Sequence, residues 1–384
     1  MSETTARNPI LVTAREHLEE IVPDLLRCSQ LGIDMESNGF YAYRERVCLL
    51  QMSTPDQDFV IDPIAFSDLS SLGPLFADPR IEKIFHAGEY DVLCLKRDYG
   101  FRFANLFDTM IASRLLGIKE LGLAAAIERH FGVKLSKKLQ RADWGKRPLS
   151  EEQVRYAQMD THFLIRLAEI LRKCIEEKGR VEDAREAFGE LTELEPVTKV
   201  FDPEGYWRMV GRHQLSGRQM ACLKEIYIYR EEQAQRLDRA HFRVMPDEVM
   251  LRVAEAIPHT HSELEKIKGM TPYLLQKYGS GLLRAVQRGL ESTLILSPPP
   301  KTERPRKSAK EWKIFEELRQ WRKSKAEREN VEPVVIMSTE TLHELARRAS
   351  QRDPDPLAAL SSLKRRRYGE ELAALLCPSA AKRP

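Results

Sequence analysis

The first half of the chain alternates short apolar runs with longer amphipathic segments. Four runs have the length and residue content of strands and are bounded by turn residues: 31–37, 46–53, 58–62 and 82–87. Apolar residues at helical spacing follow in 106–116 and over the long stretch 149–177. A series of strands followed by helices predicts a mixed α/β domain that spans residues 1–205.

Beyond this domain the hydrophobic pattern is entirely helical. Residues 211–291 read as several short helices that break at 243–246, at Pro258 and at 269–272. The segment 292–310 contains three consecutive prolines, which cannot continue a helix and favour an extended linker. Another helical segment occupies 311–378.

The two helical segments look like copies of one module. Five identical residues recur at a constant offset of 92, without a gap: Arg230/Arg322, Ala234/Ala326, Met245/Met337, Glu248/Glu340 and Ala254/Ala346. Two unrelated helical bundles that share only their amphipathic spacing are the alternative. The constant offset favours a duplication.

The net charge of +3 conceals an uneven distribution along the chain. Residues 1–210 hold 28 lysines and arginines against 35 acidic residues, whereas residues 301–384 hold 20 against 13. A basic appendage beside an acidic domain suits a protein whose appendage binds a polyanion and whose domain binds cations. Ordinary variation in surface charge explains such moderate values equally well.

Several classes of protein are excluded by what the chain lacks. No window approaches about 20 apolar residues and the first nine residues are polar, so we expect neither a transmembrane helix nor a signal peptide. The six cysteines lie far apart and form no C-x-x-C or C-x-x-H pair, which argues against a zinc site or a disulfide framework. These features predict a cytoplasmic protein that does not associate with a membrane.

Three acidic residues lie at or near predicted strands. Asp34 and Glu36 alternate with the apolar Ile33 and Met35, so both carboxylates point to the same face of the strand. Two such carboxylates repel each other and lose hydration, and a hard divalent metal ion would compensate them. A solvent-facing acid pair on an edge strand is the commoner explanation for this motif by itself. Asp91 follows the strand 82–87, at a position where a lone aspartate is most often a helix cap.

A fourth acid lies on a helix whose start is well marked. Ser150 followed by Gln153 is a capping box, which predicts that the helix begins directly after Ser150. Tyr156 and Asp160 lie four residues apart on this helix and therefore share a face. A single aspartate on a helix usually faces solvent, so the combination with the other acids carries the functional interpretation.

Together, Asp34, Glu36, Asp91, Tyr156 and Asp160 resemble the three exonuclease motifs of the DEDD superfamily, in its tyrosine-containing branch. Within this branch the chain is similar to ribonuclease D, and the likeness extends over essentially the whole chain. It includes the H-A-G-x-x-D sequence at 86–91, and the helical repeats look like tandem HRDC domains. The resemblance implies a ribonuclease H-like mixed sheet flanked by helices, followed by two all-α HRDC-like bundles.

The resemblance also implies roles for the five residues. Asp34, Glu36, Asp91 and Asp160 would hold two divalent metal ions, Mg²⁺ or Mn²⁺, with Asp34 bridging both. Glu36 and Asp160 would complete the site of the ion that activates the nucleophile, and Asp91 would act on the second ion mainly through water. Tyr156 would orient the attacking water, because a phenol with a pKa near about 10 is a poor free base.

A basic loop leads into the helix of Tyr156. Six cations lie within 134–147, where Asp143 is the only acid: Lys134, Lys137, Lys138, Arg141, Lys146 and Arg147. This loop is a candidate contact for the phosphate backbone of a nucleic acid, although a solvated loop without a ligand is the alternative. Just after the first strand, Phe40, Tyr41 and Tyr43 either stack on a terminal base or pack within a hairpin.

These observations predict a metal-dependent 3′–5′ exoribonuclease that releases nucleoside 5′-monophosphates and trims the 3′ ends of tRNA precursors as a monomer. A DNA 3′–5′ exonuclease is the main alternative. A non-catalytic nucleic-acid-binding protein is a second alternative, which the presence of all five motif residues argues against. Helicase activity is unsupported, because the chain has no G-x-x-x-x-G-K-[ST] phosphate loop.

Overall fold

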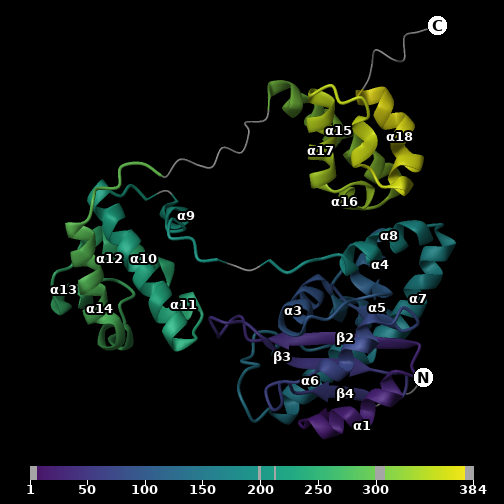
Figure 1. The fold of residues 1–384 in the computed structure, drawn as a ribbon, viewed down its shortest axis with the longest axis horizontal. Coiled ribbons are helices and arrows are strands. Elements are labelled where there is room, and N and C mark those ends of the chain that lie inside the picture. Colours follow the sequence, from purple (N-terminus) through teal and green to yellow (C-terminus); the bar gives the residue numbers. More distant parts are fainter. Residues whose placement is uncertain (1–6, 198–199, 212, 299–307, 377–384) are drawn as a thin grey trace.

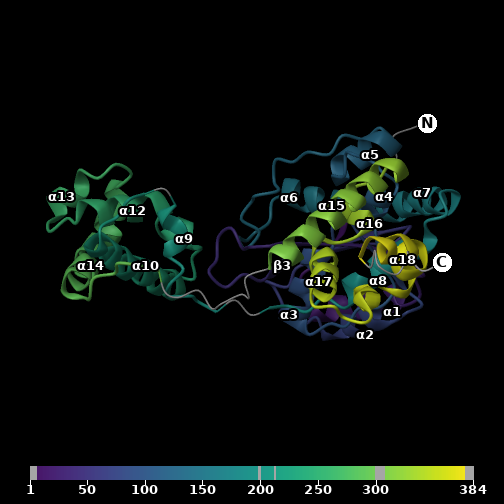
Figure 2. The same cartoon turned by 90° about the horizontal axis from the view of Figure 1, so that it is seen from above.

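The computed structural model describes residues 7–197, 200–211, 213–298 and 308–376. The chain forms an α/β domain and two helical modules, which contact the α/β domain at different places (Figures 1 and 2). Residues 299–307 of the predicted linker 292–310 and the last two residues of the predicted segment 311–378 lie outside the described residues. None of the described helices is both long enough and apolar enough to cross a membrane.

A six-stranded mixed sheet forms the centre of the α/β domain. In order across the sheet, the strands are β1 (Ile10–Val12), β4 (Asp58–Ile61), β3 (Val47–Ser53), β2 (Gln30–Ser37), β5 (Glu82–Phe85) and β6 (Leu106–Asp108). Strand β3 is antiparallel to both of its neighbours, and the other three pairs are parallel. The four predicted strands are all present, and the sheet with its flanking helices confirms the predicted fold class.

Helices cover both faces of this sheet. One face packs against α1 (Arg15–Leu25), η1 (Ser70–Leu72), α2 (Gly73–Ala77) and α3 (Glu89–Tyr99). The other face packs against α4 (Thr109–Leu115), α5 (Leu123–Phe131), α6 (Glu151–His162), α7 (Leu164–Glu177) and α8 (Val181–Thr192).

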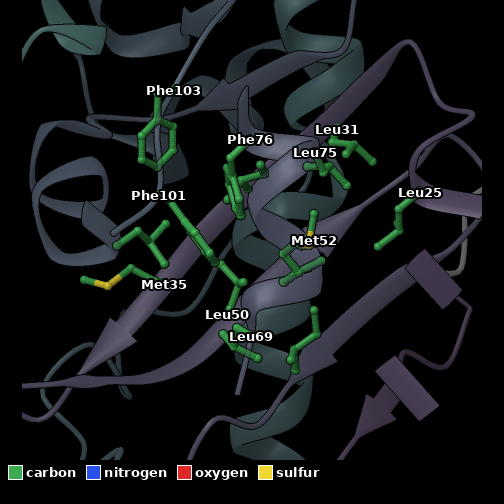
Figure 3. Packing of buried hydrophobic residues seen from close by; sticks show 14 of the residues in the cluster. Leu25, Leu31, Met35, Leu50, Met52, Leu69, Leu75, Phe76, Phe101 and Phe103 are labelled. Atoms are coloured by element: carbon green, nitrogen blue, oxygen red, sulfur yellow. The ribbon is translucent and has the colours of Figure 1, made fainter. Parts of the chain in front are cut away.

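The apolar core on the first face shows how strand alternation positions the site. Leu31 and Met35 of β2 point into this core together with Phe76 and Phe101 (Figure 3). The even-numbered residues of β2 therefore point to the opposite face, toward α6 and α7. Packing of one face thus decides which face carries the acidic side chains.

Two helix predictions were wrong. Residues 106–108 form the edge strand β6 and not the first turn of a helix. The sequence pattern misses this strand because three residues are too few to show the alternation of a strand. The helical spacing of the following residues also extends over them. The stretch 149–177 is divided into α6 and α7 at Phe163, which is 4% exposed and stacks on Phe131. No proline or glycine marks this break, so only tertiary packing reveals it.

The first helical module surrounds its own apolar core. Its helices are α9 (Trp207–Val210), α10 (Gly217–Leu237), α11 (His241–Val244), α12 (Asp247–Ala256), α13 (His261–Glu265) and α14 (Pro272–Glu291). Pro258 lies between α12 and α13, as predicted. The predicted break 243–246 contains the gap between α11 and α12 and overlaps the end of α11, and the predicted break 269–272 overlaps the gap between α13 and α14 and the first residue of α14. Tyr206 is buried in this core.

The second helical module repeats the first. Its elements are α15 (Ala309–Glu329), α16 (Pro333–Ile336), α17 (Thr339–Ser350), η2 (Pro356–Ala359) and α18 (Ser362–Leu376). Helices α10 and α15, like α11 and α16, begin and end 92 positions apart. The repeated arginine makes the same contact in each copy, since Arg230 donates to the carbonyl oxygen of Met245 at 3.1 Å and Arg322 to that of Met337 at 2.9 Å. The similarity in sequence therefore reflects one shared helical arrangement.

Candidate active site

Asp34 and Glu36 lie on the face of β2 that α6 and α7 cover. Gly32 precedes them on the same face, where a Cβ atom would lie 2.9 Å from the carbonyl oxygen of Thr161 and 3.2 Å from Cβ of Leu164. The junction of α6 and α7 thus approaches β2 closely, and glycine at this position makes the approach possible. Both carboxylates are half-buried beneath these helices.

Asp91 reaches the same place from the neighbouring strand. Because β2 and β5 are parallel, their carboxyl ends lie at the same edge of the sheet, where α3 begins. One carboxylate oxygen of Asp91 accepts a hydrogen bond from the backbone N–H of Met35 at 3.0 Å. Asp91 therefore lies beside Asp34, in a buried position.

The turn that precedes Asp91 is held by Asp108. One carboxylate oxygen of Asp108 accepts the backbone N–H of Gly88 at 2.7 Å, and the other caps the first turn of α4. A Cβ atom at Gly88 would lie 2.5 Å from the nearest side-chain atom, so the turn requires glycine. His86 belongs to this turn and its Nδ1 lies 2.8 Å from Oγ1 of Thr109. Asp108 is therefore a positioning residue, which the sequence pattern did not single out.

Helix α6 brings Tyr156 and Asp160 to the acidic face. The predicted capping box is present: the hydroxyl of Ser150 accepts the backbone N–H of Gln153 at 3.2 Å, and the side chain of Gln153 accepts the N–H of Ser150 at 3.0 Å. Tyr156 and Asp160 are both half-buried and line one cavity. The local start of the helix thus decides which of its residues face the sheet.

A buried polar network fixes the rest of α6 against the sheet. Asp58 of β4 accepts hydrogen bonds from Gln158 at 2.6 Å and from Ser53 at 2.6 Å, and its other contact is Nδ1 of His162 at 2.8 Å. The hydroxyls of Ser53 and Thr161 lie 2.7 Å apart. Sequence reasoning missed this network, and the only available signal is a set of polar residues within otherwise apolar segments. It holds the helix that carries Tyr156 and Asp160, so we regard its members as positioning residues.

The four carboxylates share surroundings that disfavour their charge. Burial raises the pKa of Asp34 to about 7, and burial with repulsion from the other three acids raises that of Glu36 to about 10. Burial and the charge of Asp34 also raise the pKa values of Asp91 and Asp160 well above their usual range. Within the described residues no lysine or arginine pairs with any of the four. An added cation would therefore stabilise this group strongly.

The chemistry of these side chains fits a hard divalent metal ion. Carboxylate oxygens are the ligands that Mg²⁺ and Mn²⁺ prefer. No three histidine, cysteine, aspartate or glutamate side chains of the described residues surround one point closely enough to ligate an ion as they stand. The fit therefore rests on the convergence of four buried acids for which the described part of the chain supplies no cation.

A cavity of about 320 Å³ opens beside Tyr156 and Asp160. Its other lining residues are Val133, Lys134, Leu135, Ser136, Leu139, Glu152, Arg155 and Met159. Apolar walls with a few polar groups are typical of a pocket for a small ligand or for the end of a larger one. Burial and the nearby acids raise the pKa of Tyr156, so its hydroxyl stays protonated and can donate a hydrogen bond into the site.

The basic loop presents five of its six predicted cations to solvent: Lys134, Lys137, Lys138, Arg141 and Lys146. Arg147 differs from them. Its guanidinium forms two contacts of 2.6 Å with the buried carboxylate of Asp62, and it donates to the carbonyl oxygens of Cys48 and Trp144. Arg147 therefore holds the loop on the sheet, and its contact with nucleic acid stays a prediction.

Comparison with known proteins defines the class to which this fold and site belong. Residues 9–176 match the family model described as 3′-5′ exonuclease. Residues 219–286 and 311–376 both match the model of the HRDC domain. The chain is thus a member of the 3′–5′ exonuclease class with two HRDC domains.

Full-length relatives narrow this class to one family. The chain is 30% identical over 374 residues to a ribonuclease D of Gluconacetobacter diazotrophicus, and the match covers 96% of this chain and 93% of that protein. The chain belongs to the ribonuclease D family of 3′–5′ exoribonucleases, which confirms the predicted class of hydrolase. Enzymes of this family use divalent metal ions.

Eukaryotic relatives match about three quarters of the chain. An exosome complex component 10 homolog of Caenorhabditis elegans is 33% identical over 281 residues, and the match covers 72% of this chain and 32% of that protein. The chain spans about a third of the length of the exosome components it matches. The crystal structure of the catalytic core of RRP6 from Trypanosoma brucei superposes with a TM-score of 0.70 at 32% identity, over 77% of this chain and 82% of that one.

Proposed function

We propose that this protein hydrolyses RNA from the 3′ end and releases nucleoside 5′-monophosphates at the site formed by Asp34, Glu36, Asp91, Tyr156 and Asp160. The observation that carries the proposal is the convergence of four carboxylates, one buried and three half-buried, beside a cavity that Tyr156 lines. Their pKa values are raised and they have no cationic partner among the described residues. As metal ligands we propose the four acids, holding two Mg²⁺ or Mn²⁺ ions.

Different residues of the site would bind the substrate and position the attacking water. The 3′-terminal nucleotide enters the cavity, where Met159 and the neighbouring apolar side chains contact it and Arg155 and Lys134 face its phosphates. The protonated hydroxyl of Tyr156 orients the attacking water, since its raised pKa keeps it from acting as a base. Bound divalent ions would lower the pKa of that water and stabilise the charge on the attacking and leaving oxygens.

As substrates we propose precursors of tRNA, and as the working form a monomer in the cytoplasm. The match to a ribonuclease D over nearly the full length of both proteins supports the substrate class. The free thiols among the described residues, of which Cys48, Cys94 and Cys222 are buried, support a reducing compartment. The five exposed cations of the basic loop support contacts with phosphates along the entry to the cavity.

The test is hydrolysis of end-labelled RNA and DNA by the full chain, with Mg²⁺ or Mn²⁺ and with EDTA. We expect 5′-labelled RNA to shorten one nucleotide at a time and 3′-labelled RNA to release labelled mononucleotide at once, with neither product in EDTA. Hydrolysis of DNA but not RNA would show a DNA exonuclease instead. Binding of RNA without hydrolysis in any metal would show a non-catalytic nucleic-acid-binding protein.

A further inference from the structure

The hairpin between β2 and β3, residues 38–46, connects the catalytic domain to the first helical module. It extends from the sheet toward α11 (Figures 1 and 2). The backbone N–H of Ala240 donates to the carbonyl oxygen of Tyr41 at 2.9 Å. The guanidinium of Arg243 lies 3.6 Å from the centroid of the Tyr41 ring. The tip of the hairpin is therefore docked on the connection between α10 and α11.

Two of the three hairpin aromatics are used in this contact. The hydroxyl of Tyr43 donates to the carboxylate of Glu231, and its ring meets that of His241 edge-on at 5.3 Å. The hydroxyl of Tyr41 donates to the carbonyl oxygen of Arg141, in the basic loop, at 3.0 Å. Of the two roles considered for these residues, the structure gives hairpin packing to Tyr41 and Tyr43.

Three other aromatic rings at this junction remain exposed to solvent. Phe40 is 53% exposed, Phe242 is 52% exposed and Tyr273 is 47% exposed. Each of them lies beside at least one cation. We call the whole set the junction track: Phe40, Phe242, Tyr273, Arg141, Arg239, Arg243 and Lys277.

The first part of the track lies against the basic loop. The guanidinium of Arg141 is 6.0 Å from the centroid of Phe40, and that of Arg243 is 5.8 Å from the centroid of Phe242. Arg243 also donates to the carbonyl oxygen of Phe40 at 2.6 Å. Arg243 therefore contacts the backbone of Phe40 and the ring of Phe242, which lie on opposite sides of the boundary between the two domains.

The second part of the track lies at the start of α14. The hydroxyl of Tyr273 accepts hydrogen bonds from Arg239 at 2.9 Å and from Lys277 at 3.0 Å. The hydrogen bond from Lys277, followed by the effects of Arg239, lowers the pKa of Tyr273. Arg239 directly precedes Ala240, the residue that docks the hairpin, so both parts of the track meet at this connection.

None of the four cations of the track forms an ion pair with a carboxylate of the described residues. The nearby acids are already engaged: Asp238 accepts the backbone N–H of Arg44 at 2.8 Å, and Glu231 contacts Tyr43 and His241. The track therefore carries unbalanced positive charge between exposed rings. Alternating cations and aromatic rings are the pattern of surfaces that bind single-stranded nucleic acid, since cations contact the backbone and rings stack on bases.

The track is also continuous with the catalytic cavity. Arg141 belongs to the loop whose earlier residues, among them Lys134 and Leu139, line the cavity beside Tyr156. A strand whose 3′ nucleotide lies in that cavity would leave it along this loop. An acidic protein surface could also match the charge of the track. The structure favours RNA as the occupant, because the track adjoins the cavity that we propose binds the 3′ end of RNA.

We propose that the junction track binds the single-stranded segment of RNA directly 5′ of the nucleotide in the catalytic cavity, with bases stacked on Phe40, Phe242 and Tyr273. This inference rests on the proposed exoribonuclease function and adds the path of the substrate. It makes the first helical module part of the binding site through the hairpin that docks on it. Longer strands should therefore bind more tightly than a dinucleotide.

The test compares binding and hydrolysis in the full chain. Binding of oligoadenylates of about 4 to 16 nucleotides, the range of single-strand sites, is measured in an Asp160→Asn background that prevents degradation. The Phe40→Ala/Phe242→Ala variant should bind the longest strand about 5- to 100-fold more weakly for each stacked base lost. In the otherwise unaltered enzyme, the same pair of substitutions should leave hydrolysis of a dinucleotide unchanged, because a dinucleotide does not reach the track.

Two controls keep the result specific. Trp312→Ala removes a ring that is 55% exposed on α15, far from the track in sequence, and should not change binding. Phe40→Trp keeps a ring for stacking and should retain affinity. Lys277→Gln should lower the slope of log affinity against log salt by about 0.7, the value for one phosphate contact on a single strand.

Unchanged binding of the longest strand by the double variant would overturn the proposal, as would an equal loss in Trp312→Ala. Loss of dinucleotide hydrolysis in the double variant would show that the two rings are needed for the structure of the catalytic domain itself. This result would also overturn the proposal. Failure of the proposed function gives a different result, since the unaltered enzyme would then hydrolyse no RNA of any length.

Discussion

The α/β domain carries two groups of acidic side chains that are stabilised in different ways. The catalytic group consists of Asp34, Glu36, Asp91 and Asp160. The α8 group consists of Glu182, Asp183 and Glu186. Both groups concentrate negative charge on a small area, so each requires a source of positive charge.

The second helical module supplies that charge to the α8 group. Lys364 lies 3.0 Å from Glu186, and Arg366 lies 3.0 Å from Glu182. Arg367 contacts both carboxylate oxygens of Asp183, at 2.5 and 2.6 Å. These three cations lie on α18, so this acidic surface is an interface between two parts of one chain.

The catalytic group has no such partner among the described residues. Burial, joined at three of the four acids by repulsion from neighbouring acids, raises its pKa values, and no cation of the described chain offsets this. An acidic cluster that meets cations of its own chain is therefore a contact surface. An acidic cluster that is buried without cations of its own chain is a candidate binding site for an added cation. The two acidic groups look alike in the sequence. Only the presence or absence of a cationic partner in the structure distinguishes the α8 group from the catalytic group.

The same comparison applies to the basic residues. The second module has the larger excess of positive charge in the sequence, yet all four cations at 364–367 pair with acids, Arg365 with Asp355 and the others with α8. The junction track, which spans the basic loop, the hairpin and the first module, leaves its four cations without a carboxylate among the described residues. Net charge therefore does not by itself show which module has cations available to RNA.

The largest expected effect comes from removing one member of the unpaired group. Asp160→Asn should lower turnover by at least about 10⁴-fold, since metal ions contribute several kcal/mol to stabilising the transition state. Single-turnover hydrolysis of labelled RNA measures this rate. The matched control is Glu182→Gln, which removes a paired carboxylate and should leave turnover within about twofold. Equal losses in both variants would contradict the distinction between the groups.

Tyr156→Phe should have the next largest effect. The unpaired acids and burial keep its hydroxyl protonated, so removal of the hydroxyl should lower the rate by roughly 10²–10⁴-fold through the loss of water positioning. RNA affinity, measured in the presence of Ca²⁺ to suppress hydrolysis, should hardly change. An unaltered single-turnover rate would show that the tyrosine serves packing alone.

A charge reversal on α8 should change binding more modestly. Asp183→Arg places two guanidiniums against each other and should release the second module, which exposes the cations of α18 to RNA. The slope of log affinity against log salt should steepen by about 0.7–0.9 for each cation freed. Fluorescence binding across a salt series gives this slope.

Two further variants control for the change in net charge. Glu177→Lys, at an exposed position at the end of α7, should leave the slope unchanged. Combining Asp183→Arg with Arg367→Asp reverses the pair and should restore the original slope. A slope that does not respond to Asp183→Arg would show that α18 cannot bind phosphate even when it is released.

The smallest expected effect concerns stability without metal. Burial and repulsion raise the pKa of Glu36 to about 10, so the folded state binds more protons than the unfolded state above pH of about 4.5. Stability should therefore fall as pH rises through this range, and Glu36→Gln should melt at a higher temperature than the parent at pH of about 8. The gain should be about 2–4 °C for each kcal/mol regained.

Thermal melting in EDTA at pH of about 5 and 8 measures this gain. It should be smaller at the lower pH, because there the unfolded state still binds part of the proton that the folded state holds on Glu36 at both pH values. The control is Glu182→Gln, where the loss of an ion pair should lower the melting temperature or leave it unchanged. A variant Glu36→Gln that melts lower than the parent at both pH values would contradict the proposed repulsion.

Local rules account for the parts of the molecule that were predicted correctly. Strand alternation places Asp34 and Glu36 on one face, and the capping box at Ser150 places Tyr156 and Asp160 on one face of α6. The repeat offset of 92 anticipates the equivalent contacts of Arg230 and Arg322. Each of these predictions needs only residues that are close in the sequence or a comparison of the sequence with itself.

The parts that were missed depend on contacts between distant segments. Strand β6 forms because β5 lies beside it, and α6 ends at Phe163 because Phe131 stacks there. In the sequence, Arg147 is one of six cations in the basic loop. Only the structure shows its contact with Asp62, which lies 85 positions away. No pattern within one segment reports which distant partner a side chain will meet.

The sequence by itself therefore determined the class of fold and the duplication, since these follow from short-range periodicity and a comparison of the sequence with itself. It also placed Asp34 with Glu36, and Tyr156 with Asp160, on shared faces, whereas their joint role came from the resemblance to a known family. Only the tertiary structure decided which charges remain available. Charges interact through space and at short range, so an ion pair such as Asp183 with Arg367, 184 positions apart, cancels two residues that the sequence counts separately. The acids of the catalytic group and the cations of the junction track stay unpaired because the fold brings no described ion-pair partner to them.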